Sequence, residues 1–66
     1  MSTFGERLCR ARKAAGLTQK EVAEQLHLHR STYTKYERGQ AEPSLTILYQ
    51  IVRILQVDVM TLIEPD

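Results

Sequence analysis

The sequence has a single cysteine, no tryptophan, few glycines and no long apolar run. The lone Cys9 excludes an internal disulfide and cannot hold a metal ion by itself. Three glycines and two prolines exclude collagen-like and low-complexity chains. No stretch approaches about 18 consecutive apolar residues, and the first residues lack the pattern of a signal peptide, so no membrane association is expected. We therefore expect one small cytoplasmic domain over residues 1–66.

The residues that are present are typical of a globular chain with an uneven charge distribution. Apolar residues make up 42% and charged residues 26%, a balance that excludes intrinsic disorder. The net charge is only +1, yet residues 1–40 carry eight basic and four acidic side chains. Residues 41–66 carry one basic and four acidic side chains. This asymmetry predicts a polyanionic partner on one side of the molecule only.

Polar residues at helix-cap spacing predict an all-α fold without strands. Thr3 with Glu6 and Thr18 with Glu21 each have the spacing of a capping box. No segment alternates apolar and polar residues over a strand length. The first helix has Phe4, Leu8, Ala11 and Ala15 on one face and is ended by Gly16. The other expected helices span about 19–26, 30–38, 45–55 and 59–63, with caps at Thr18, His29, Ser44 and Asp58, and the last is ended by Pro65.

Pairs of apolar residues support these helix starts. Each pair is five residues apart and brackets a cap, which is the spacing of a hydrophobic staple. The pairs are Leu17–Val22, Leu28–Tyr33 and Val57–Leu62. The segment 19–38 then reads as two short helices joined by a tight turn at His27, a unit that presents its second helix to the DNA major groove.

The chain resembles the Cro and phage-repressor type of helix-turn-helix, the XRE family, from Phe4 to Ile63. The matching residues are Arg12, Gly16-Leu17-Thr18-Gln19, Val22-Ala23, Leu26, Tyr33, Lys35-Tyr36-Glu37-Arg38-Gly39, Pro43-Ser44-Leu45 and Leu48. It departs from the family at His27, where glycine is usual in the turn, and at His29, where serine is usual at the cap. His27 must then adopt a positive φ, which costs about 1 kcal/mol relative to glycine.

The resemblance implies a five-helix, lambda-repressor-like domain that binds double-stranded DNA. It implies a partly buried ion pair between Arg12 and Glu37 that orients the recognition helix. The positions that correspond to DNA contacts are Gln19, His29, Arg30, Ser31, Thr34, Lys35, Arg38 and Gln40. The residue chemistry agrees, because arginine binds guanine O6 and N7 bidentately.

Other interpretations of the same residues stay open. The polar residues of the third helix could form an ordinary solvated face. His27 and His29 lack a convincing third metal ligand, and Cys9 is more typical of a packed side chain than of a redox sensor. We see no catalytic constellation, so we expect no enzyme, no metal and no cofactor.

The fourth helix is more apolar than one small core requires. Its apolar positions cover about 220° of the helix surface at 100° per residue. One interpretation is a central helix packed by all the others. The interpretation that we favour is a homodimer seam formed by Ile47, Ile54, Met60 and Ile63, with two recognition helices one DNA turn apart.

Together these features predict a sequence-specific transcriptional regulator, a repressor that binds a palindromic operator as a homodimer. Three alternatives remain at this point. The chain could be the antitoxin of a toxin–antitoxin pair or the controller protein of a restriction–modification system. It could also be a protein-interaction module without DNA binding.

Overall fold

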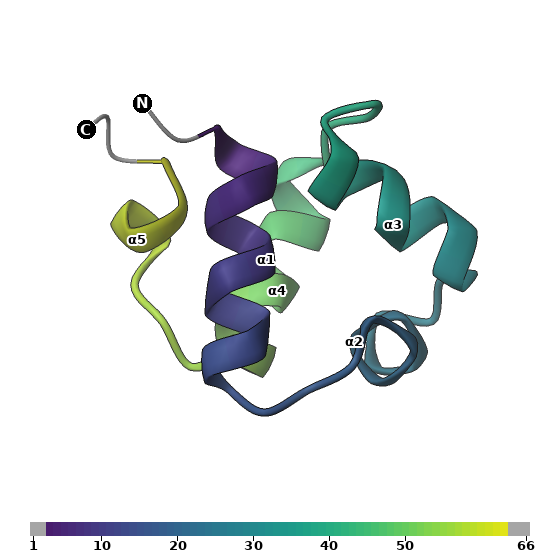
Figure 1. The fold of residues 1–66 in the computed structure, drawn as a ribbon, viewed down its shortest axis with the longest axis horizontal. Helices are drawn as coiled ribbons and strands as arrows, with labels where there is room; N and C mark the ends of the chain where they lie inside the picture. The colour runs from purple at the N-terminus through teal and green to yellow at the C-terminus, as the bar shows by residue number, and fades with distance from the viewer. Residues whose placement is uncertain (1–2, 64–66) are drawn as a thin grey trace.

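The computed structural model describes residues 3–63, which form five α-helices and no strand (Figure 1). The helices are α1 (Phe4–Ala14), α2 (Gln19–Gln25), α3 (Arg30–Arg38), α4 (Leu45–Leu55) and α5 (Val59–Ile63). The all-α prediction is confirmed, and each helix begins at its predicted residue. The predicted role of Pro65 in ending the last helix lies outside the described residues.

The helices begin where they do because side chains satisfy the free N–H groups of their first turns. Thr3 Oγ1 accepts from Glu6 N at 3.2 Å, and Glu6 Oε1 accepts from Thr3 N at 2.8 Å. Thr18 and Glu21 form the same reciprocal pair at 3.0 and 2.8 Å. Ser44 caps α4 by accepting from Ile47 N at 3.2 Å. Both capping boxes are therefore confirmed, and each cap contributes about 1 kcal/mol to stability.

The ends of the helices need backbone conformations with positive φ. Gly16 and Gly39 follow α1 and α3 with φ of 76° and 75°. His27 has φ of 58°, which confirms the conformation predicted for the turn. Gln56, after α4, has φ of 56° although no glycine marks that position in the sequence. Ala15 caps the end of α1 and is exposed, unlike Leu8 and Ala11, with which it was predicted to share a face.

Every helix contributes at least one large, fully buried side chain to the core. The largest fully buried side chains are Leu8, Val22, Tyr33, Ile51 and Leu62. Burying such a side chain stabilises the fold by about 1.5–3 kcal/mol. The first members of the predicted staples, Leu17, Leu28 and Val57, are half-buried against this core. These three residues therefore pack the starts of α2, α3 and α5 against the core.

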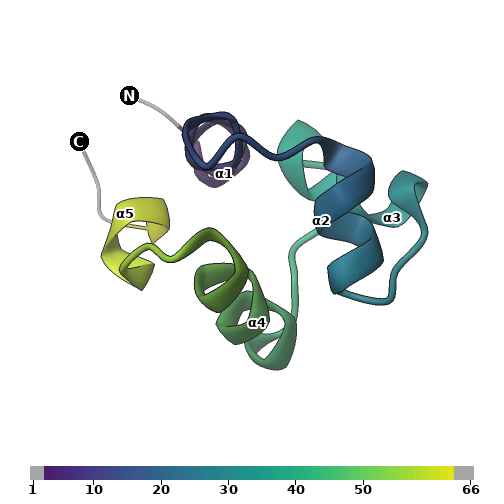
Figure 2. The same cartoon turned by 90° about the horizontal axis from the view of Figure 1, so that it is seen from below.

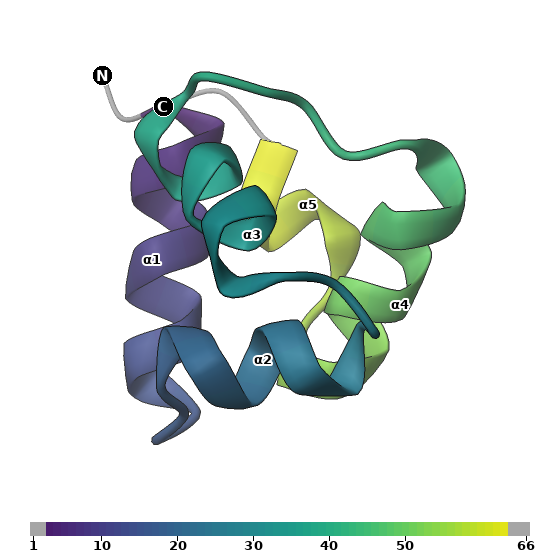
Figure 3. The same ribbon diagram turned by 90° about the vertical axis from the view of Figure 1, so that its right-hand side faces the viewer.

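The five helices place α2 and α3 together at one end of the molecule. α1 contacts both α3 and α5, while α2 contacts α3 and α4. Seen from below, α1, α2, α4 and α5 surround the core (Figure 2). Figure 3 shows the end that carries α2 and α3, with the turn between them on the surface. Within residues 3–63, α5 lies on the opposite side of the molecule from α2 and α3 (Figure 1).

Gly5 allows α1 to approach the end of α3 very closely. This glycine is buried. A Cβ atom at this position would lie 2.4 Å from the carbonyl oxygen of Glu37 and 2.8 Å from that of Tyr36. Any larger residue at position 5 would therefore push α3 away from α1. The position of α3 thus depends on a glycine outside the helix-turn-helix unit.

Candidate nucleic-acid interface

The side chains of α3 divide into a buried face and an exposed face. Tyr33 and Tyr36 are buried, and their rings meet edge to face with centroids 6.2 Å apart. This pair fixes the inner face of the helix, because aromatic contacts of this geometry add to the burial energy. On the other face, Arg30, Ser31 and Lys35 are exposed. The helix is therefore anchored from inside and presents polar side chains outward.

A surface hollow of about 410 Å³ brings together seven of the eight residues predicted to contact DNA. The residues that line it are Gln19, Arg30, Ser31, Thr34, Lys35, Arg38 and Gln40. They come from the start of α2, the outer face of α3 and the loop after α3. His29, the eighth, is exposed at the cap of α3, does not line this hollow and makes no side-chain cap bond.

The lining of this hollow is basic. Arg30, Lys35 and Arg38 contribute positive charge, and no acidic residue lines the hollow. Within residues 3–63 none of these three side chains forms an ion pair. Three unpaired basic groups around one concave surface attract an anion such as a phosphate backbone.

The Thr34 side chain is hydrogen-bonded to the backbone of its own helix. It is half-buried, and its hydroxyl donates a hydrogen bond to the Arg30 carbonyl oxygen at 2.8 Å. The donor of Thr34 is therefore occupied by its own helix. What remains for a ligand is the methyl group and the lone pairs of the hydroxyl oxygen.

A second hollow of about 470 Å³ adjoins the first along α2. Its lining includes Lys20, a basic residue that the sequence analysis did not select. Gln19 and Arg30 line both hollows and so lie between them. The sequence indicates a DNA contact for Lys20 only through its place as the second residue of the helix expected to cross the phosphate backbone.

Arg12 and Glu37 lie together on the inner side of α3, behind the basic hollow. Arg12 Nε is 2.7 Å from Glu37 Oε2, and Arg12 is only 8% exposed. Arg12 Nη1 also donates to the Leu17 carbonyl oxygen at 2.8 Å. The guanidinium thereby links α1, the loop before α2 and the end of α3.

The Glu37 carboxylate accepts two further hydrogen bonds. The Tyr33 hydroxyl donates to Oε2 at 2.6 Å, and Gln19 Nε2 donates to Oε1 at 3.0 Å. Burial raises the pKa of Glu37, but the hydrogen bonds from Arg12, Tyr33 and Gln19 outweigh it, so the pKa lies below its usual value. Burial also raises the pKa of the Tyr33 hydroxyl. The ionised form of Glu37 is thus the form that the fold stabilises.

The four residues of the predicted dimer seam differ in exposure. Met60 and Ile63 are about half exposed, whereas Ile47 and Ile54 are half-buried against the core of the same chain. Of the described residues, Leu45, 85% exposed, and Tyr49, 60% exposed, are the most exposed large apolar side chains, and neither was predicted to lie in the seam.

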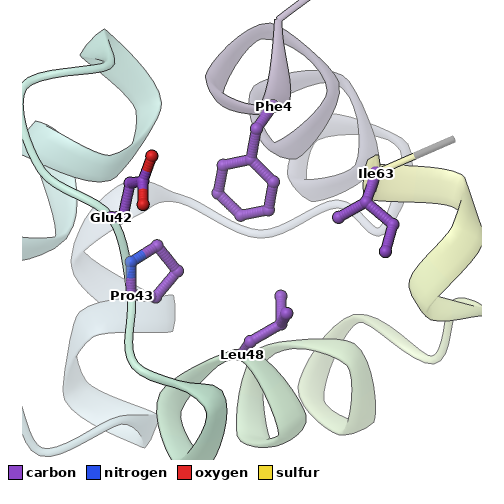
Figure 4. A pocket seen from close by; sticks show the side chains of 5 residues that line it. All are labelled: Phe4, Glu42, Pro43, Leu48 and Ile63. Atoms are coloured by element: carbon purple, nitrogen blue, oxygen red, sulfur yellow. The ribbon is translucent and has the colours of Figure 1, made fainter. Parts of the chain in front are cut away.

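An apolar groove of about 260 Å³ lies between α1, α4 and α5. Phe4, Leu48 and Ile63 point toward one another across it, and Pro43 and Glu42 form its other side (Figure 4). The groove joins Ile63 to the apolar surface of α4.

The described residues 3–63 contain no group of three or more metal-ligating side chains. Cys9 is half-buried, and its sulfur lies 3.6 Å from Arg12 Nη2. Within the same range no helix has the length and apolar character needed to cross a bilayer.

An exposed basic helix, braced by a second helix across a tight turn, defines a helix-turn-helix protein. The protein-family comparison agrees, since a family model described as helix-turn-helix matches residues 10–62. The chain belongs to this family, the XRE type of helix-turn-helix proteins.

Individual relatives carry related names. The SPbeta prophage-derived HTH-type transcriptional regulator YonR of Bacillus subtilis is 44% identical over 54 residues, which are 82% of this chain and 50% of that protein. The cryptic phage CTXphi transcriptional repressor RstR of Vibrio cholerae is 33% identical over 82% of this chain and 48% of its own length. The chain spans about half the length of these curated relatives.

A solved structure has the same fold over most of both chains. The restriction-modification controller protein C.AhdI from Aeromonas hydrophila matches with a TM-score of 0.82 and 36% identity, covering 89% of each chain. This likeness agrees with the all-α, lambda-repressor-like architecture.

Proposed function

We propose that this regulator is a repressor that binds a palindromic DNA operator as a homodimer. The observation that carries the proposal is the basic hollow formed by the start of α2, α3 and the following loop. A repressor of this kind works by occupancy, because a dimer over a promoter excludes the polymerase. We place its action in the cytoplasm, where such operators are read, and assign it no catalytic step.

Five of the seven side chains that line the hollow have a role that fits their chemistry. Arg30, at the exposed start of α3, suits a bidentate contact to guanine. The Thr34 methyl group suits a thymine methyl, because the hydroxyl proton is already used within α3. Lys35, Arg38 and Gln40 suit phosphate oxygens along the groove edge. His29, at the cap of α3, suits a contact at the same edge.

The homodimer is supported by the exposed apolar surface of α4 and α5. Met60 and Ile63 supply half-exposed apolar area, and the groove beside Ile63 is lined by Phe4 and Leu48. A two-fold interface there is expected to hold two copies of α3 about 34–36 Å apart, one turn of DNA. Ile47 and Ile54, which are half-buried against the core of the same chain, then form the part of the interface next to that core.

The proposal is tested by selecting an operator from random DNA and measuring the salt dependence of binding. We expect a palindromic sequence, bound by two chains. The logarithm of the binding constant is expected to fall with the logarithm of salt concentration, with a slope of about −0.9 per phosphate contacted. A chain that bound no duplex DNA at any salt concentration would instead be a protein-interaction module.

The likeness to C.AhdI favours a second candidate, a restriction–modification controller that activates transcription. A reporter gene behind the selected operator distinguishes the two. Repression predicts lower expression when the protein is supplied, and activation predicts higher expression.

A further inference from the structure

An exposed apolar strip on α4 runs beside the apolar groove. Its members, Leu45 and Tyr49, are both exposed and lie one helical turn apart. Leu48 lines the groove together with Phe4 and Ile63 (Figure 4). At about 100° per residue, Leu48 and Tyr49 lie within about 60° of Leu45 around the helix axis. The strip and the groove therefore form one continuous apolar surface, which we call the α4 surface.

The α4 surface carries both a projection and a recess. Leu45 and Tyr49 project from the helix, and the groove of about 260 Å³ lies next to them. A two-fold interface uses the same patch on both copies, so this patch must be complementary to itself. A projection beside a recess meets this requirement, because each copy can fill the groove of the other.

Arg53 holds Tyr49 in place for such a contact. Its Nη1 donates a hydrogen bond to Tyr49 Oη at 2.9 Å, and its guanidinium carbon lies 5.6 Å from the centre of the ring. A side chain that is already held loses less freedom on association, which favours binding. Tyrosine and arginine are also among the residue types that contribute most to the stability of protein interfaces.

The charges at the two ends of the α4 surface are complementary. Glu42 lies on the wall of the groove just before α4, and Arg53 lies about two turns beyond the start of the helix. Within residues 3–63 neither side chain forms an ion pair. Two copies of α4 that cross antiparallel near Tyr49 place the start of one helix against the later turns of the other. Arg53 of each copy then approaches Glu42 of the second copy.

We propose that the α4 surface is the centre of the homodimer interface. Tyr49 of each copy enters the groove of the other, and Arg53 pairs with Glu42 across the interface. The inference rests on the proposed function and names the side chains through which the two copies meet.

This centre differs from that of the predicted seam. Ile47 and Ile54 lie about 160–180° around the helix axis from Leu45, and both are half-buried against their own core. Ile63 stays in the interface, because it lines the groove that the second copy fills. The interface therefore extends from Ile63 along the exposed side of α4, with Ile47 and Ile54 at its margin.

The first test compares Leu45→Asp with Gln50→Asp in the full chain. Both residues are exposed on α4, so both variants should keep the circular dichroism spectrum of the wild type. Gln50 is the matched control, because it lies about 140° around the helix from Leu45 and outside the α4 surface. Dimer dissociation constants are measured by sedimentation equilibrium. We expect Leu45→Asp to raise the constant by roughly thirtyfold or more and Gln50→Asp to change it by less than about threefold.

The second test exchanges the charges of Arg53 and Glu42. Arg53→Glu and Glu42→Arg each bring like charges together, and each should raise the dimer dissociation constant by about fivefold. The double variant restores opposite charges across the interface, so it should form a tighter dimer than either single variant.

DNA binding separates this interface from the contacts to DNA. A duplex that carries one half-site of the selected operator needs only one chain, so Leu45→Asp and Gln50→Asp should bind it equally tightly. On the full palindrome, Leu45→Asp should bind more weakly than Gln50→Asp, because it no longer gains from pairing with a second copy.

Two results would overturn the inference while leaving the homodimer in place. One is a dimer dissociation constant that Leu45→Asp leaves unchanged, and the other is a double charge variant that dimerises no better than the single variants. A wild type that remains a single chain, both alone and on the palindrome, would overturn the homodimer of the proposed function, and this inference with it.

Discussion

Replacing Gly5 with alanine is the substitution for which the structure reverses the usual expectation. In an ordinary helix interior, glycine to alanine stabilises the helix by about 0.8–1 kcal/mol. Here the new Cβ would lie 2.4 Å from the Glu37 carbonyl oxygen and 2.8 Å from the Tyr36 carbonyl oxygen. Ordinary contact begins at 3.4 Å, so α1 and the end of α3 would have to separate by about 1 Å. No rotamer change can relieve the contact, because both obstacles are backbone atoms.

The expected size of the effect follows from these opposing contributions. Overpacking a well-packed contact costs about 1–3 kcal/mol, and the gain in helix propensity offsets part of that cost. We expect Gly5→Ala to lower the free energy of unfolding by about 1–2 kcal/mol. For a domain of this size that corresponds to a fall in Tm of about 5–15 °C. Thermal unfolding followed by circular dichroism measures this change.

Gly16→Ala is the matched control for the Gly5 substitution. A Cβ at Gly16 meets nothing within 4 Å, but the φ of 76° makes alanine unfavourable by about 1–2 kcal/mol. Both variants should therefore lose stability, but only Gly5→Ala displaces α3 and should weaken operator binding at temperatures where both are folded. If Gly5→Ala unfolds at a higher temperature than the wild type, α1 does not approach α3 as closely as described.

Further predictions concern the turn, the buried carboxylate and two basic residues that are proposed to face DNA. His27→Gly removes a strained φ of 58° and should raise Tm by about 4–8 °C, corresponding to about 1 kcal/mol. Because the fold lowers the pKa of Glu37, the ionised carboxylate stabilises the fold above the ordinary value of 4.5, and this stabilisation is lost as the pH falls below that value. Urea unfolding on both sides of that pH should show a smaller fall in the free energy of unfolding for Glu37→Gln than for the wild type. Arg30→Ala should weaken operator binding by about 1–3 kcal/mol and relax the preference at one base pair, as measured by repeated selection. Lys20→Ala should weaken binding to all sequences alike and reduce the magnitude of the salt slope by about 1 in a titration series.

The features predicted correctly from the sequence are those that neighbouring residues determine. A capping box such as Thr18 with Glu21 needs only four consecutive residues, so its spacing is visible before any fold is known. The positive φ at His27 was predicted from the resemblance, because the family usually has glycine at this position of the turn. The polar outer face of α3 followed from the resemblance together with helical periodicity.

The features that the sequence did not reveal depend on contacts between distant segments. In the sequence, Gly5 is simply a residue between the two partners of a capping box, and only the structure shows that it lies against the end of α3. The bond from Gln19 to Glu37 joins residues 18 positions apart. Leu45 and Tyr49 resemble core residues by type, and only the packing of α4 shows that they are exposed. Gln56 adopts a positive φ without a glycine, because the tertiary fold outweighs its local preference.

The residues that hold α3 in place are largely separate from those that face DNA. Tyr33, Tyr36 and Glu37 hold the helix from its inner side, so exchanging Arg30 or Lys35 should leave the fold intact. Operator preference can therefore change by surface substitution while the scaffold remains constant. Gln19 and Thr34 are the exceptions, because each uses part of its hydrogen-bonding capacity inside the protein. Substitutions at these two positions should therefore alter stability and DNA binding together, whereas those at exposed positions of α3 should alter DNA binding alone.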